Sequence, residues 1–169
     1  MQTLMNSFKR FTLIILGAIA MTSCDPCSGV ICTNGTCSNG TCVCEPGYER
    51  NNSNCIAVNQ FYVGTGTVTA TLVAVDVNGN SNTTNNVGYT LNASTTDPYV
   101  FTLVSFNGLI KNDISFKISD SNHDVIIADS TTTSAGNAYT YSGGKVGNQV
   151  QLVIKDTATE TTYTVAFVA

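Results

Sequence analysis

All seven cysteines of this 169-residue chain lie between Cys24 and Cys55, and none follows. A segment of fewer than about 40 residues buries too little apolar surface to fold without cross-links. The six cysteines after Cys24 contain no C-x-x-C pair, the usual arrangement in zinc sites. Disulfides, which persist in exported proteins, are therefore expected rather than a metal. Spacing alone does not choose among the many pairings of the cysteines after Cys24; these are Cys27, Cys32, Cys37, Cys42, Cys44 and Cys55.

An uncharged apolar run, Phe11–Ala20, follows Lys9 and Arg10 near the start of the chain. It is too short to cross about 30 Å of hydrocarbon as a helix, but it suits the apolar region of a signal peptide. The run leads into Met21-Thr22-Ser23-Cys24, which resembles the lipobox of bacterial lipoproteins. This resemblance implies cleavage before Cys24 and a diacylglycerol thioether, with its fatty acyl chains, on that cysteine.

Two other fates are open to this leader: ordinary secretion after the A-x-A-like Ala18–Ala20, and retention as an uncleaved anchor. The odd cysteine count favours lipidation, because a lipidated Cys24 leaves an even set. We therefore expect residues 1–23 to be a lipoprotein signal peptide, and the mature chain to be held by its lipid on the cell envelope, at the outer membrane. Loss of Lys9 and Arg10 leaves five positive and eleven negative residues, a net charge of −6. Nucleic acid is not an expected partner.

The segment Cys42–Tyr48 (CVCEPGY), followed by Cys55, resembles the C-terminal signature of an EGF-like domain. The resemblance implies an EGF-like segment over residues 24–56, with Gly47 allowing a turn. It also implies the pairings Cys27–Cys37, Cys32–Cys42 and Cys44–Cys55. We expect a spacer or a protein-binding module without calcium, because only Asp25 stands where calcium-binding members have several acidic or amide residues.

Period-two alternation of apolar and polar residues recurs through residues 57–169 and predicts strands with one face inward. It is clearest over 87–93, 114–118, 150–154 and 163–167, and weaker over 65–77, 99–105, 125–129 and 137–141. Turn residues separate these segments at 78–80, 97–98, 107–108, 120–122, 143–144 and 156–160. The pattern predicts an all-β domain of eight antiparallel strands, closed as an up-and-down barrel or split into a sandwich.

Two stretches, Phe61–Val68 and Tyr141–Leu152, resemble segments of the lipocalin-like β-barrel domains of bacterial lipoproteins. The resemblance implies a barrel whose interior holds a small apolar ligand. An aromatic residue usually closes the barrel floor in that family, and Gly66 stands in its place here.

Few residues are candidates for chemistry. The runs that start at Asp76 and Asp120 begin like calcium loops but lack the later Gly and Glu, so they are interpreted as hairpin turns. His123, the only histidine, is expected to be a solvated loop residue. We therefore expect no catalytic residue, no metal site and no cofactor.

The tyrosines are either core residues or a binding surface, because aromatic side chains dominate interaction hot spots. Tyr139 and Tyr141 share one face of a predicted strand and form the best candidate for an exposed patch. The expected function is a non-enzymatic binding, adhesion or scaffold module for a protein or glycan partner, which predicts a filled core. The alternative is a carrier of a small apolar ligand, which predicts a cavity lined by inward residues such as Phe116.

Overall fold

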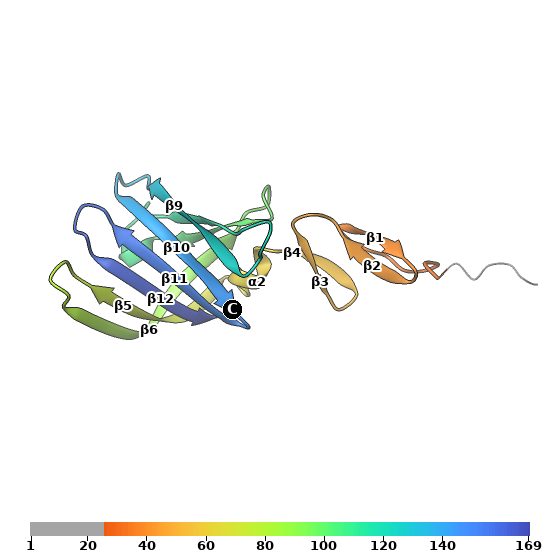
Figure 1. Cartoon of the computed structure of the whole chain (residues 1–169), viewed down its shortest axis with the longest axis horizontal. Helices are drawn as coiled ribbons and strands as arrows, with labels where there is room; N and C mark the ends of the chain where they lie inside the picture. The colour runs from red at the N-terminus through yellow and green to blue at the C-terminus, as the bar shows by residue number, and fades with distance from the viewer. Residues whose placement is uncertain (1–25) are drawn as a thin grey trace, which may run out of the picture.

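The computed structural model describes residues 26–169. The expected signal peptide, residues 1–23, and the expected lipid attachment site, Cys24, lie outside the described residues. Figure 1 shows an elongated molecule in which a small N-terminal part is followed by a larger β-structure. We call residues 26–57 the disulfide module and residues 67–168 the barrel.

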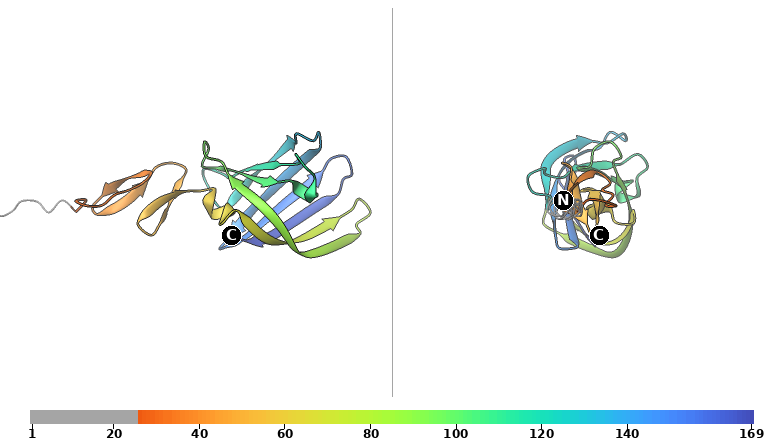
Figure 2. Two further views of the ribbon diagram at one scale, coloured as in Figure 1. Left: turned by 180° about the vertical axis from the view of Figure 1, so that it is seen from behind. Right: turned by 90° about the vertical axis from the view of Figure 1, so that its right-hand side faces the viewer.

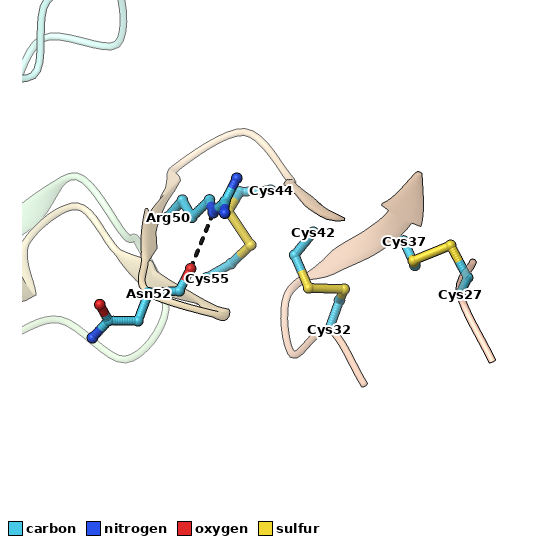
Figure 3. Close-up of a disulfide and its surroundings, with 8 residues drawn as sticks. All are labelled: Cys27, Cys32, Cys37, Cys42, Cys44, Arg50, Asn52 and Cys55. Atoms are coloured by element: carbon cyan, nitrogen blue, oxygen red, sulfur yellow. Dashed lines mark hydrogen bonds between the residues drawn. A yellow bond between two sulfur atoms is a disulfide. The ribbon is translucent and has the colours of Figure 1, made fainter. Parts of the chain in front are cut away.

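Two hairpins build the disulfide module. β1 (Gly35–Ser38) pairs with β2 (Thr41–Cys44), and β3 (Tyr48–Asn51) pairs with β4 (Asn54–Ala57). Figure 3 shows the disulfides in a row along the module. They confirm the pairings that the EGF-like resemblance implied: Cys27–Cys37, Cys32–Cys42 and Cys44–Cys55.

One antiparallel sheet forms the barrel, after the short helix α2 (Gln60–Val63). Its strands are β5 (Thr67–Val75), β6 (Ser81–Ala93), β7 (Val100–Val104), β8 (Ile114–Lys117), β9 (Val125–Thr132), β10 (Ala138–Val146), β11 (Gln149–Asp156) and β12 (Thr162–Val168). Their order is β8-β7-β6-β5-β12-β11-β10-β9. A bridge between Ile118 and Ile126 brings the two ends of the sheet together, so the barrel is nearly closed (Figure 2). This confirms the predicted all-β fold with eight antiparallel strands.

The alternation in the sequence places side chains as predicted. Along β11, Val150, Leu152 and Ile154 are fully buried, whereas Gln151 between them is exposed. Phe116 of β8 is also buried, as expected for an inward position.

Two local predictions need correction. Gly143 and Gly144, predicted as a turn, lie inside β10 beside a register shift, and the turn comes after Val146. The reason is close chain approach, because a Cβ on Gly143 would lie 2.3 Å from the Gln151 carbonyl oxygen. In addition, β6 begins at Ser81, well before the alternation that starts at Val87.

Aromatic rings pack together in both halves of the barrel. In the half next to α2, the ring of Phe101 stacks on those of Tyr62 and Phe116, with centroids 5.2 Å apart in both pairs. In the other half, the buried Phe106 ring meets Tyr139 and Tyr163 edge-on, at centroid distances of 5.8 and 5.2 Å. Tyr62 comes from α2, so this helix supplies the aromatic floor that Gly66 does not.

The disulfide module is joined to the barrel by short-range contacts as well as by the chain. The Val58 N–H donates to the Gly47 carbonyl (2.9 Å), and the Asn59 N–H donates to the Pro98 carbonyl (2.8 Å). Gly47 has a φ of 87° and lies so near Pro98 that a Cβ would come within 2.3 Å of that ring. Only glycine suits this position, because a side chain would be strained by the backbone and would collide with Pro98.

Candidate binding surface

The predicted tyrosine patch does not exist as a surface. Tyr139 and Tyr141 do share a face of β10, but that face points into the barrel, and they are 3% and 8% exposed. The hydroxyl of Tyr139 accepts a hydrogen bond from Asn112, and the ring of Tyr141 packs edge-on against Phe116. Burial raises the pKa of Tyr141, with a smaller contribution from Asp129. The prediction failed because a shared face in an alternating strand is normally the core face.

His123 lies in a turn, as predicted, but its side chain is only 27% exposed and contacts other residues. Its Nδ1 is hydrogen-bonded to Oε1 of Glu49 in the disulfide module, and its ring lies against that of Tyr99. The backbone carbonyl of His123 accepts a hydrogen bond from the Tyr62 hydroxyl (2.7 Å). Burial raises the pKa of Tyr62, and the negative charges of Asp124 and Glu49 add to the shift. His123 therefore links the two parts of the molecule.

The end of the barrel farthest from the disulfide module carries the more unusual surface. We call it the free end, and it consists of the connections 76–80, 105–113, 133–137 and 157–161 (Figure 2). The connection 105–113 holds three non-glycine residues in the left-handed region, Ser105, Asn107 and Lys111, with φ values of 50°, 58° and 65°. A left-handed backbone conformation at a non-glycine residue costs on the order of 1 kcal/mol of folding free energy. It is kept only where contacts with neighbouring residues fix it.

A buried asparagine supplies that restraint. Asn112 is fully buried, and its Nδ2 donates to the Phe106 carbonyl and to the Tyr139 hydroxyl, both at 3.0 Å. Its Oδ1 accepts from Thr133 (3.0 Å) and from Asn137 (3.1 Å). All the hydrogen-bonding groups of the side chain are engaged, so Asn112 locks the connection 105–113 to the neighbouring connection 133–137.

The locked connection presents apolar side chains to solvent. Leu109 and Ile110 are 50% and 83% exposed at its tip, while Phe106 from the same connection closes the barrel interior. A pair of exposed aliphatic side chains on a rigid loop is typical of an interaction surface, because little conformational entropy is lost when a partner covers them.

A hollow of about 560 Å³ lies beside this loop. Its apolar lining comes from Leu72, Val87, Tyr89 and Val104, and Asn107 and Gly108 of the loop form one side. The hollow exists because β7 ends at Val104, opposite Thr90, whereas β6 continues beyond that point to Ser81. Among the described residues, the stretch Ser81–Tyr89 therefore pairs only with β5 and leaves its other edge open.

The opposite end of the barrel has a hollow of about 440 Å³ on the outer side of Gly143 and Gly144. The Lys145 ammonium group at its rim lies over the rings of Phe61 and Tyr62, 5.2 and 5.6 Å from their centroids. It is also 3.9 Å from Asp124. Because these contacts already occupy the only cation of the hollow, it is the weaker candidate.

The turn at Asp76 is a hairpin turn, as predicted. The Oδ1 of Asp76 accepts hydrogen bonds from the backbone N–H groups of Asn78 and Asn80, and its Oδ2 accepts one from the Asn80 side chain. These bonds, the Asn80 side chain's first, lower the pKa of Asp76. Within residues 26–169, no group of three or more His, Cys, Asp or Glu side chains is placed to hold a metal ion. In the same range, no helix has the length and apolar character needed to span a membrane.

Comparisons with protein-family models, with curated proteins and with solved structures found no match to this chain. The class is therefore defined by the fold alone, as an all-β protein with a disulfide-rich N-terminal module and a nearly closed eight-stranded barrel.

Proposed function

We propose that this protein is a lipid-anchored binding module of the bacterial cell envelope, without enzymatic activity. In this proposal the lipid on Cys24 holds the chain at the outer membrane, and an EGF-like disulfide module lifts a lipocalin-like barrel away from the surface. The observation that supports it best is the position of the free end. The hairpins of the free end lie farthest from residue 26, where the anchored segment joins (Figure 1), and its connection 105–113 presents Leu109 and Ile110 to solvent.

The filled interior favours a surface role over the carrier alternative. Tyr62 and Phe106 close the two ends of the barrel, and both are fully buried. The rings of Phe101 and Phe116 occupy the space between strands where an apolar ligand would lie. A ligand would have to displace packed aromatic side chains, each worth several kcal/mol to the core.

A protein partner suits the free end better than a glycan does. Aromatic side chains that would stack on sugar rings, such as Tyr139 and Tyr141, are inside the barrel. What the free end offers is aliphatic surface and an open strand edge, which are the features that other polypeptides recognise.

The binding role is tested by photocrosslinking in the cells that make the protein. A photoreactive amino acid replaces Ile110 at the free end, and in a matched variant it replaces Val146, which is 85% exposed at the other end. We expect protein adducts from position 110 and none of the same mass from position 146. Equal labelling at both positions would contradict a binding surface at the free end.

The anchoring role has its own test, the variant Cys24→Ala. We expect this change to move the protein from the membrane fraction to the soluble fraction, because it removes the acceptor of the lipid. The intact chain should also carry the mass of residues 24–169 plus acyl groups. Retention of the variant in membranes would contradict lipid anchoring, while leaving the crosslinking result unaffected.

A further inference from the structure

The open edge of β6 is a strand edge without protection. Natural edge strands are usually guarded by charged side chains, by proline or by bulges. The chain contains no charged residue and no proline from Val77 to Thr96, which covers all of β6. A bulge disturbs the pairing with β5 near Asn86, which has a φ of 59°. The regular stretch Ser81–Thr84, before the bulge at Asn85 and Asn86, has no charged residue, proline or bulge.

The hydrogen bonds of the hairpin show which backbone groups are free. The Asp76 N–H donates to the Asn80 carbonyl, so these two residues face each other as a bonded pair. In an antiparallel pair, bonded and non-bonded positions alternate. Asn82 and Thr84 therefore direct their backbone groups toward β5, and Ser81 and Thr83 direct theirs toward the open edge.

We infer that this edge pairs with the same edge of a second copy of the chain, antiparallel and centred on Thr83. The inference rests on the proposed function and names the partner of the free end. A two-fold axis through the centre places Thr83 opposite Thr83 and Asn82 opposite Thr84. The edge is then complementary to itself, as a symmetric dimer interface requires.

Charge favours a second copy at this place. The mature chain carries a net charge of −6, so two copies repel each other over most of their surfaces. Both strands of the β5–β6 hairpin are uncharged, and its single charged residue, Asp76, lies at the turn. Two acidic molecules meet with least repulsion where neither presents a charge. A strand laid along β6 also covers the apolar hollow of Leu72 and Val87.

The symmetry of the pairing determines how the two copies are oriented. Antiparallel strands in one sheet are related by a two-fold axis normal to the sheet, and this rotation reverses every direction within the sheet. The long axis of the molecule runs along the barrel wall (Figure 1). The two disulfide modules therefore point in opposite directions, and the paired copies are anchored in two membranes that face each other.

The first test is sedimentation equilibrium of the chain from residue 25 onward, without lipid. We expect a weak monomer–dimer equilibrium, because the paired strand is short. Thr83→Lys, which places two like charges opposite each other, should lower the association constant about tenfold or more. Thr83→Pro should do the same by removing an outward N–H. The matched control is Thr140→Lys on β10, an exposed position on a strand paired on both sides, which should not change the association.

The second test uses phosphatidylcholine vesicles that carry a chelating lipid and bind the same chain through an N-terminal histidine tag. Vesicles coated with the wild-type chain or with Thr140→Lys should cluster, and vesicles coated with Thr83→Lys should not. A wild-type chain that stays monomeric at all concentrations would overturn the self-pairing. Dimers in solution without clustering would overturn the opposed orientation. Crosslinks from position 110 to a different protein, together with a monomeric chain, would overturn this inference and leave the binding function standing.

Discussion

The disulfide module and the barrel reach a fixed structure by opposite means. Among the buried hydrophobic residues of the structure, only Cys42 and Cys55 belong to the module, and both are in disulfides. The barrel contains no cysteine, and its buried side chains form one continuous core. Cross-links restrict the unfolded state of a segment too small for a core, whereas a larger segment is stabilised by removing apolar surface from water.

The comparison also explains where each part carries its contacts. Each inward side chain stabilises the barrel by burying apolar surface, so the interior is packed and Tyr139 and Tyr141 face inward. Its surface is left to connections such as 105–113, which the core residue Asn112 holds in place. The module has no spare interior, and its contacts with the barrel come from Gly47, which lies against Pro98, and from Glu49, which is hydrogen-bonded to His123.

Reduction of the disulfides should give the largest difference in stability between the disulfide module and the barrel. Each disulfide closes a loop with a sequence separation of 10 or 11 residues, and such a cross-link contributes about 2–4 kcal/mol. We expect reduction to abolish amide-exchange protection over residues 26–57 and to leave the protection of the barrel strands in place. Exchange measured by NMR before and after reduction checks this. Loss of protection in β11 would show that the barrel depends on the module.

The converse change is Phe101→Ala in the barrel. Phe101 is fully buried and stacks on rings from α2 and β8, so its truncation should lower the free energy of unfolding by about 3–5 kcal/mol. Urea unfolding measures this, with Val146→Ala as a control that should change stability by less than about 0.5 kcal/mol. The three disulfides should still form in the variant, as a mass increase on reduction and alkylation would show. Scrambled pairing would mean that the barrel guides the folding of the module.

The parts that sequence reasoning predicted well are those governed by short-range patterns. Alternation placed Leu152 and Phe116 inward, and the EGF-like resemblance implied the three disulfide pairings. Asn112 was missed because an asparagine between Lys111 and Asp113 looks like any turn residue, and its burial depends on partners 21 to 27 positions away. The open edge was missed because it arises where β6 continues past the end of β7. Local sequence patterns do not predict how far two neighbouring strands extend relative to each other.

The tyrosines show a second feature that the sequence pattern does not predict. Alternation correctly put Tyr139 and Tyr141 on one face, but the sequence does not say which face of an amphipathic tyrosine pair meets water. The fold decides it, because β11 and β9 on either side of β10 present Leu152 and Ile126 to the same interior. His123 likewise found a partner, Glu49, that lies 74 residues earlier in the chain.

The contact between Glu49 and His123 gives the smallest expected effect and the sharpest test of how independent the two parts are. Glu49→Gln keeps a hydrogen-bonding group and removes the charge. The two side chains are 38% and 27% exposed, so water screens the pair, and its contribution should stay below about 1 kcal/mol. A double-mutant cycle with His123→Gln, read from urea unfolding of the barrel, isolates the coupling. A coupling near zero to 1 kcal/mol means that two separately stabilised units touch. A coupling of several kcal/mol would mean that the module and the barrel unfold together. The two parts would then form one cooperative unit, although one is stabilised by cross-links and the other by a core.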